Sequence, residues 1–86
     1  MAGLSKETRI LILQFLWETM KENPTRIVRG KELMDHLEID EYSLKANIRL
    51  LTDLKWVKLF SKDIDVRSFI KITDEGIRQV EHLSDG

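Results

Sequence analysis

Apolar side chains recur at a helical spacing along residues 6–22, KETRILILQFLWETMKE, which predicts a helix there. Ser5 precedes this segment, where its side-chain oxygen can cap the start of the helix. Asn23-Pro24 ends the helix, because a residue that precedes proline avoids the helical region of backbone space. A helical wheel gives one broad apolar face, made of Ile10, Leu13, Leu16, Trp17 and Met20.

Three shorter elements are expected before residue 55. Residues 25–30, TRIVRG, are β-branched and end in glycine, so they predict a brief strand. Residues 31–37, KELMDHL, predict a two-turn helix, and EID forms the turn to a third helix over residues 41–54. Asp40 is a suitable N-cap for that third helix, with Ile39 before it as a hydrophobic staple. Its inward side is expected to hold Leu44, Ile48, Leu51 and Leu54.

The last third of the chain is predicted to form two strands followed by a helix. WVKLF at 56–60 and RSFIKI at 67–72 predict strands, and the short loop SKDIDV between them predicts an antiparallel hairpin. Residues 73–83, TDEGIRQVEHL, predict a final helix that Thr73 caps. The order of elements predicts a single α+β domain over residues 1–86, with an ordered core at about 5–83.

Composition supports a folded domain and excludes some kinds of site. Apolar residues make up 42% of the chain and charged residues 34%, which is typical of folded rather than disordered proteins. The absence of cysteine excludes disulfides and thiolate metal sites. Residues 1–9, MAGLSKETR, lack the features of a signal peptide, and no apolar run could span a bilayer, so we expect a cytoplasmic protein that does not enter a membrane. The net charge of −1 means that any DNA binding must rest on a local positive patch.

Residues suited to catalysis or metal binding are few. His36 and His82 are far apart in the sequence, and neither has a partner at the spacing of metal ligands. The chain contains no nucleophile elbow, phosphate-binding loop or zinc-binding helix motif. We therefore expect no enzyme activity, no cofactor, no metal and no small-molecule ligand.

Two stretches resemble a known family. They are GKELMDHLEIDEYSLKANIRLLTDLKWVKLF at 30–60 and ITDEGIRQVEHL at 72–83. The chain is similar over about residues 5–83 to winged helix-turn-helix domains of small MarR-, ArsR- and PadR-type transcriptional regulators of prokaryotes. The resemblance implies a three-helix core, a short strand plus a two-stranded wing, and a C-terminal helix. It also implies specific binding of double-stranded DNA, with helix 41–54 in the major groove and hairpin 56–72 as the wing. Lys55 stands where the family often has glycine.

The outward side of the third helix holds the residues expected to read DNA. A step of about 100° per residue turns this side away from the apolar positions, and the N-terminal part of a recognition helix faces base edges. The candidates are Tyr42, Ser43, Lys45, Ala46 and Arg49. Arg49 can hold guanine by two hydrogen bonds, and Ser43 can donate to a phosphate. The alternative is an ordinary solvated face, because Glu41 and Lys45 are spaced four apart as helix ion pairs are.

Further cations are expected to contact the DNA backbone from two other segments. Lys62 and Arg67 lie in the predicted wing, where the family often places a basic residue on phosphate or in the minor groove. An equally simple interpretation is a charged hairpin that stays soluble. Arg29 and Lys31 lie at the start of the second helix, where free backbone N–H groups can also bind phosphate.

Leu11 and Phe15 fall on the outer side of the first helix and need a partner. Either the final helix packs there, or the first and last helices form a homodimer interface, as related regulators commonly do. A dimer would suit a palindromic DNA site. The slight negative charge and these apolar residues favour a different function, a protein-interaction module or adaptor that has the same fold and does not bind DNA.

Overall fold

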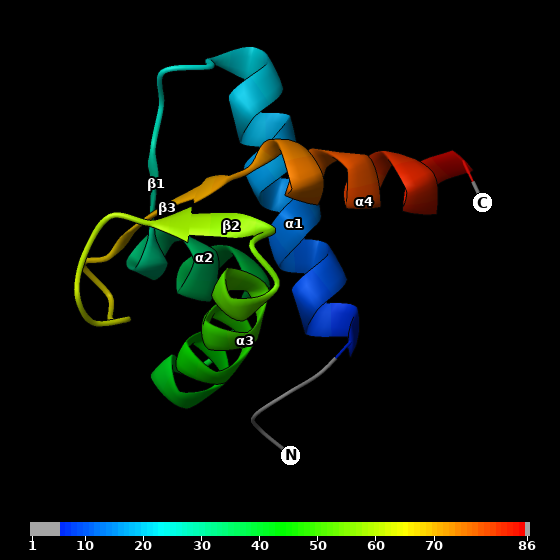
Figure 1. The fold of residues 1–86 in the computed structure, drawn as a ribbon. Coiled ribbons are helices and arrows are strands. Elements are labelled where there is room, and N and C mark those ends of the chain that lie inside the picture. Colours follow the sequence, from blue (N-terminus) through cyan, green and yellow to red (C-terminus); the bar gives the residue numbers. More distant parts are fainter. Residues whose placement is uncertain (1–5, 86) are drawn as a thin grey trace.

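Four helices and one small antiparallel sheet form the part of the chain that the computed structural model describes, residues 6–85 (Figure 1). The elements in chain order are α1 (Lys6–Glu22), β1 (Val28–Arg29), α2 (Gly30–Leu37), α3 (Glu41–Asp53), β2 (Val57–Leu59), β3 (Phe69–Ile72) and α4 (Asp74–Asp85). The α+β class and the predicted order of elements are confirmed. The expected cap Ser5 lies outside the described residues.

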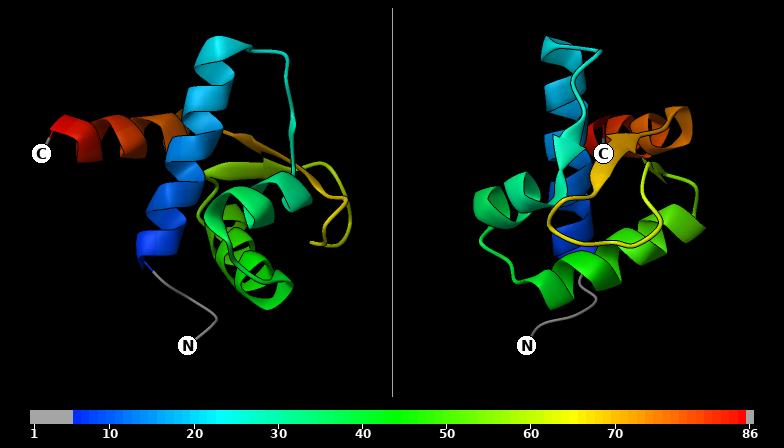
Figure 2. Two further views of the ribbon diagram at one scale, coloured as in Figure 1. Left: turned by 180° about the vertical axis from the view of Figure 1, so that it is seen from behind. Right: turned by 90° about the vertical axis from the view of Figure 1, so that its left-hand side faces the viewer.

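The sheet has the strand order β1-β3-β2, so β3 is its central strand. β2 and β3 pair antiparallel with Lys58 opposite Lys71, which confirms the predicted hairpin. β1 pairs with the other edge of β3, where Arg29 lies opposite Phe69. α1 packs against β3 and α4 packs against α1. The right-hand view of Figure 2 shows the strands in front of α1, with one face of the sheet turned away from it.

The core lies where α1, α2 and α3 meet the sheet. α3 contributes Leu44, Ile48 and Leu51, each fully buried as predicted. The buried side of α1 is centred on Ile12 and Leu13, which is rotated from the predicted face. The rotation follows from the position of α1, because it contacts α2, α3, β3 and α4 and is covered from several sides. The other buried apolar residues are Leu16, Val28, Leu33, Val57, Ile70, Ile72 and Val80.

The end of α3 is fixed by a residue with left-handed backbone geometry. Lys55 has φ 65°, so the chain does turn left-handed at the position where the resemblance led us to expect glycine. The N–H groups of Lys55 and Trp56 donate to the carbonyls of Thr52 and Leu51, each at 3.0 Å, and so satisfy the last turn of α3. Leu54 was expected to point inward, and this was wrong. Leu54 is 42% exposed, although its backbone keeps helical geometry and its N–H donates to the carbonyl of Leu50 at 3.0 Å.

The start of α4 is tied to the end of α3 through Thr73. Its hydroxyl donates to the carbonyl of Lys55 at 2.7 Å and accepts from the N–H of Gly76 at 3.1 Å, which confirms the predicted cap. A Cβ at Gly76 would collide with the carbonyl oxygen of Trp56, so only glycine permits this close approach. The junction sets the position of α4 beside α1.

Candidate nucleic-acid interface

Asp40 fixes the start of α3, the helix expected to enter a groove. Its carboxylate accepts from the N–H of Ser43 at 2.7 Å, so the predicted N-cap is confirmed. Asp40 is therefore engaged by its own helix. The anchored helix α3 packs against α2 and α1 on its buried side and against β2 near its end.

The outward side of α3 carries three of the predicted reading residues as exposed side chains. Tyr42 is 67% exposed, and Lys45 and Arg49 are exposed one and two turns further along the helix. Ala46 is half-buried. Ser43 does not belong to this face. It is only 8% exposed, because it lies on the side of α3 that contacts the core, so it is not available to a phosphate.

A buried polar pair on α3 was not anticipated from the sequence. Asn47 is fully buried, and its side-chain amide donates to the carbonyl of Ser43 at 2.7 Å. A buried amide must be satisfied in this way, since leaving it unpaired costs about 1–3 kcal/mol. The acceptor is a backbone carbonyl, which every residue carries, so the identity of residue 43 gave no signal for this bond in the sequence.

The loop between β2 and β3, residues 60–68, folds back on itself around Ser68. The hydroxyl of this fully buried serine donates to the carbonyl of Asp63 at 2.7 Å and accepts from the N–H of Asp65 at 2.8 Å. The carboxylate of Asp65 accepts from the N–H of Arg67 at 2.8 Å. The loop is thus internally hydrogen-bonded, and it runs beside α3 in the right-hand view of Figure 2.

The start of α2 is closed by this same loop, which corrects the prediction of a phosphate site there. The N–H of Gly30 donates to the carbonyl of Ser68 and that of Lys31 to the carbonyl of Val66, each at 2.9 Å. These N–H groups are therefore not free for a ligand. The ammonium of Lys31 lies 3.3 Å from the carboxylate of Asp35. The guanidinium of Arg29 lies over the ring of Phe69, on the sheet rather than at the helix start.

Two shallow hollows, of about 310 and 300 Å³, lie between α3 and the loop, and Arg49 lines both. The other charged residues that line one or both hollows are Lys45, Lys62, Asp53, Asp63 and Asp65. Three cations therefore face three carboxylates. Arg67 is exposed but lines neither hollow. Lys62 lines one hollow and Lys45 the other, with Arg49 between them, and the carboxylates interrupt any continuous positive face.

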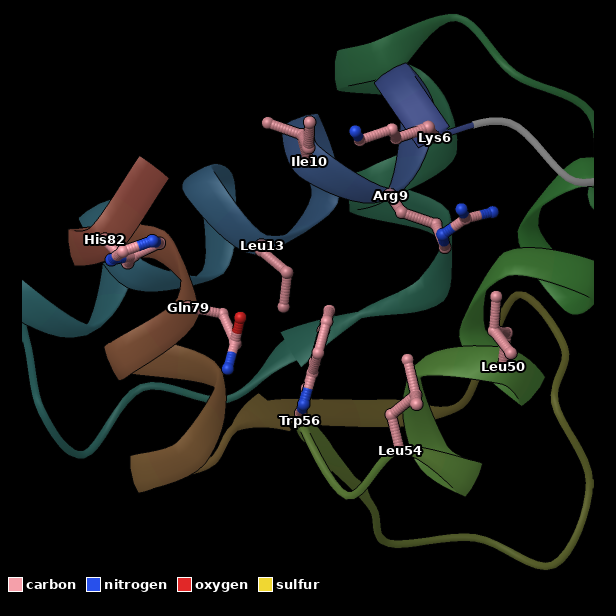
Figure 3. Close-up of a pocket in the computed structure, with 9 residues that line it drawn as sticks. All are labelled: Lys6, Arg9, Ile10, Leu13, Leu50, Leu54, Trp56, Gln79 and His82. Atoms are coloured by element: carbon pink, nitrogen blue, oxygen red, sulfur yellow. The ribbon is translucent and has the colours of Figure 1, made fainter. Parts of the chain in front are cut away.

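A third hollow is apolar and lies on the opposite side of α3. It has a volume of about 280 Å³ and is formed by Ile10 and Leu13 of α1, Leu50 and Leu54 at the end of α3, and Trp56 (Figure 3). Gln79 and His82 of α4 and Lys6 and Arg9 of α1 complete its lining. We call this hollow the apolar cleft. It explains the exposure of Leu54, which sequence analysis placed in the core.

The two predicted interface residues of α1 have different surroundings. Leu11 is 48% exposed, so it does lie on the outer side of the helix. Phe15 is partly buried, and its ring centroid lies 4.4 Å from that of His36 on α2. Phe15 is therefore covered by α2. The sequence had led us to expect that the final helix or a second subunit covers it.

Other kinds of site have no support within residues 6–85. No group of three or more His, Asp or Glu side chains there could hold a metal, and no helix there is long and apolar enough to cross a membrane. Comparisons of the chain with family models, curated proteins and solved structures find no match.

Proposed function

We propose that this chain is a winged helix-turn-helix protein that binds double-stranded DNA specifically and acts as a small transcriptional regulator. The observation that carries the proposal is the pairing of α3 with the loop beside it. Tyr42, Lys45 and Arg49 are exposed on one side of a capped helix whose inward side is buried in the core through Leu44, Ile48 and Leu51. The β2–β3 loop runs alongside, in the place of a wing. This arrangement supports insertion of α3 into a major groove.

Each exposed residue has a distinct role in this proposal. Arg49 is suited to two hydrogen bonds with a guanine edge, and Lys45 to a guanine or a phosphate. Tyr42, at the N-terminal turn of α3, is suited to a sugar or phosphate oxygen. Lys62 and Arg67 of the loop are suited to the backbone beside the groove. The three carboxylates near Arg49 weaken attraction to phosphate, so base contacts must supply much of the affinity.

Selection from a pool of random duplex DNA at two salt concentrations tests the proposal. We expect an enriched motif whose binding weakens with salt, and we expect Arg49→Ala to lose about 1–3 kcal/mol at one base pair. Arg78→Ala is the matched control, because Arg78 is an exposed arginine on α4 that pairs with Glu75. Weak binding that is equal for wild type, Arg49→Ala and Arg78→Ala would refute the regulator function.

Within the same proposal the regulator is a homodimer, joined along the apolar cleft. The cleft lies between α1 and α4, and its apolar lining would be removed from water in a dimer. We expect the enriched DNA motif to be two-fold symmetric and sedimentation to show a dimer. Leu54→Asp, which places a charge at an already exposed position of the cleft, should give a folded monomer.

The adaptor function is the second candidate, and two observations favour it. The charges around Arg49 balance, and the apolar cleft offers a surface for another protein. This function predicts no enriched DNA motif and no effect of Arg49→Ala. It also predicts that Leu54→Asp abolishes binding to a protein partner without changing the oligomeric state.

A further inference from the structure

The outer face of the sheet carries two exposed phenylalanines side by side. The N–H of Phe60 donates to the carbonyl of Phe69 at 3.0 Å, which extends the pairing of β2 and β3 by one position. Phe60 is 48% exposed and Phe69 is 38% exposed. Residues directly opposite on neighbouring strands have Cβ atoms about 4.5–5.5 Å apart. The two rings therefore form one apolar surface at the loop end of the sheet.

Cations surround the two rings on the same face. Arg29 lies opposite Phe69 on β1, and its guanidinium carbon is 5.1 Å from the centre of the Phe69 ring. Lys58 precedes Phe60 by two residues, and its ammonium is 5.2 Å from the centre of the Phe60 ring. Lys71, two residues after Phe69, lies opposite Lys58. One carboxylate lies at the edge of this surface, because Glu32 accepts from the backbone N–H of Arg29 at 3.3 Å.

The alternation of burial shows that all five side chains share the outer face. Val28 and Ile70, which neighbour Arg29 and Phe69 along their strands, are buried, as is Val57 beside Lys58. Successive side chains of a strand point to opposite faces. The apolar neighbours face α1 and the core, so the cations and rings lie on the opposite face, where the ammonium of the half-buried Lys71 donates to the carbonyl of Pro24 at 3.3 Å. We call the surface of Arg29, Lys58, Phe60, Phe69 and Lys71 the sheet platform.

We propose that the sheet platform binds single-stranded DNA. Proteins that bind single strands without sequence preference combine a positive surface that follows the backbone with aromatic rings on which bases stack. Phe60 and Phe69 are suited to stack about two bases, and the guanidinium plane of Arg29 extends that surface. Lys58 and Lys71 are suited to the phosphates. Stacking on the rings and contact with phosphates do not involve the sugar, so the platform needs no ribose 2′-hydroxyl and DNA satisfies it in full.

Four of the five platform residues belong to the hairpin that carries the proposed wing, but none belongs to α3, so variants of α3 separate this function from duplex binding. A single strand is the better ligand for this face, since stacking on a ring requires a base whose face is open. Duplex DNA offers the phosphates alone, and would bind the platform more weakly and without dependence on the rings.

Fluorescence anisotropy with labelled oligo-dT of about twelve nucleotides tests the proposal. We expect Phe69→Ala and Phe60→Ala each to weaken binding by roughly five- to a hundredfold, which corresponds to the loss of one stacked base. Phe60 lies beyond the end of β2 and is more exposed than Phe69, so Phe60→Ala remains a fair test if Phe69→Ala perturbs the sheet. Phe69→Trp should retain binding, because it keeps a stacking ring. Circular dichroism melts check that each variant is folded.

Matched controls separate this proposal from the proposed regulator. Tyr42→Ala removes an exposed aromatic ring from α3, and Arg49→Ala removes a cation there. Both should leave oligo-dT affinity within about twofold, whatever they do to duplex binding. Equal affinity of wild type and Phe60→Ala for oligo-dT would overturn the proposal. Binding of oligo-U more than tenfold tighter than oligo-dT would also overturn it, because it would show an RNA site. Binding of polyglutamate as tight as oligo-dT, retained in Phe69→Ala, would overturn it too, because it would show a surface for acidic protein.

Discussion

Gly30 holds the β2–β3 loop against α2, and Gly30→Ala tests how firmly. A Cβ at this position would collide with the carbonyl oxygen of Asp65 and lie 3.1 Å from a methyl carbon of Leu44. The colliding atom belongs to the main chain, so a change of side-chain rotamer cannot relieve the contact. Gly30→Ala must therefore displace the loop or shift the start of α2.

The structure sets the size of the effect. Displacing the loop breaks the hydrogen bonds from Gly30 to Ser68 and from Lys31 to Val66, each of which contributes about 0.5–1.5 kcal/mol. Alanine offsets part of this loss, because it lowers the entropy of the unfolded chain and so stabilises by about 0.4–1 kcal/mol. We expect the free energy of unfolding to fall by about 1–2 kcal/mol. The melting temperature should fall by roughly 5–15 °C.

Urea unfolding followed by tryptophan fluorescence measures the change in stability, and amide hydrogen exchange measures the change in the loop. The amides of Gly30 and Lys31 should exchange faster in the variant, because their acceptors belong to the loop. Lys31→Ala is the matched control. It removes only an exposed ion pair with Asp35 and should cost less than about 0.5 kcal/mol. If the variant keeps its stability and both amides stay protected, the inference that Gly30 holds the loop against α2 is wrong.

Three further predictions concern caps, backbone strain and charge. Asp40→Ala should cost about 1 kcal/mol in urea unfolding, because the N–H of Ser43 loses its acceptor, while Asp40→Asn should cost little. Lys55→Gly should raise the melting temperature, since it relieves about 1 kcal/mol of left-handed strain, and an increase of the same size in Lys55→Ala would contradict this reason. Asp63→Asn should tighten duplex binding by about two- to fivefold at low salt, because its carboxylate and Arg49 line the same hollow. An affinity that does not change would argue against contact between this surface and DNA.

The elements of the fold could be predicted from the sequence because each has a local cause. The helical spacing over 6–22 and the side-chain caps Asp40 and Thr73 are set by neighbouring residues, whereas the left-handed turn at Lys55 was expected only from the family resemblance. What failed were the assignments that depend on packing. Leu54 has the correct spacing for the core of α3, but no other element covers its side chain fully, and it lines the apolar cleft.

The candidate site was predictable only on the surface of α3. The helical step placed Tyr42, Lys45 and Arg49 outward, and the structure has them exposed. The closure of the start of α2 depends on Ser68, which lies far along the chain and whose buried hydroxyl organises the loop. The sheet platform also escaped notice, because it depends on the registers that bring Phe60 and Arg29 beside Phe69, which local spacing does not determine.

Asp63 and Asp65 differ in what their carboxylates do, and this bears on how α3 could select a sequence. The carboxylate of Asp65 accepts from the N–H of Arg67 and so belongs to the fold of the loop. Asp63 uses its backbone carbonyl for the loop, and no hydrogen bond or ion pair within residues 6–85 engages its carboxylate. Under the proposed function, that charge beside Arg49 reduces attraction to any phosphate backbone and leaves base contacts to decide the affinity. A regulator that must find few sites among many competing ones depends on the ratio of specific to non-specific binding rather than on total affinity. The carboxylate of Asp63 would raise that ratio, so Asp63→Asn should gain more non-specific than specific affinity.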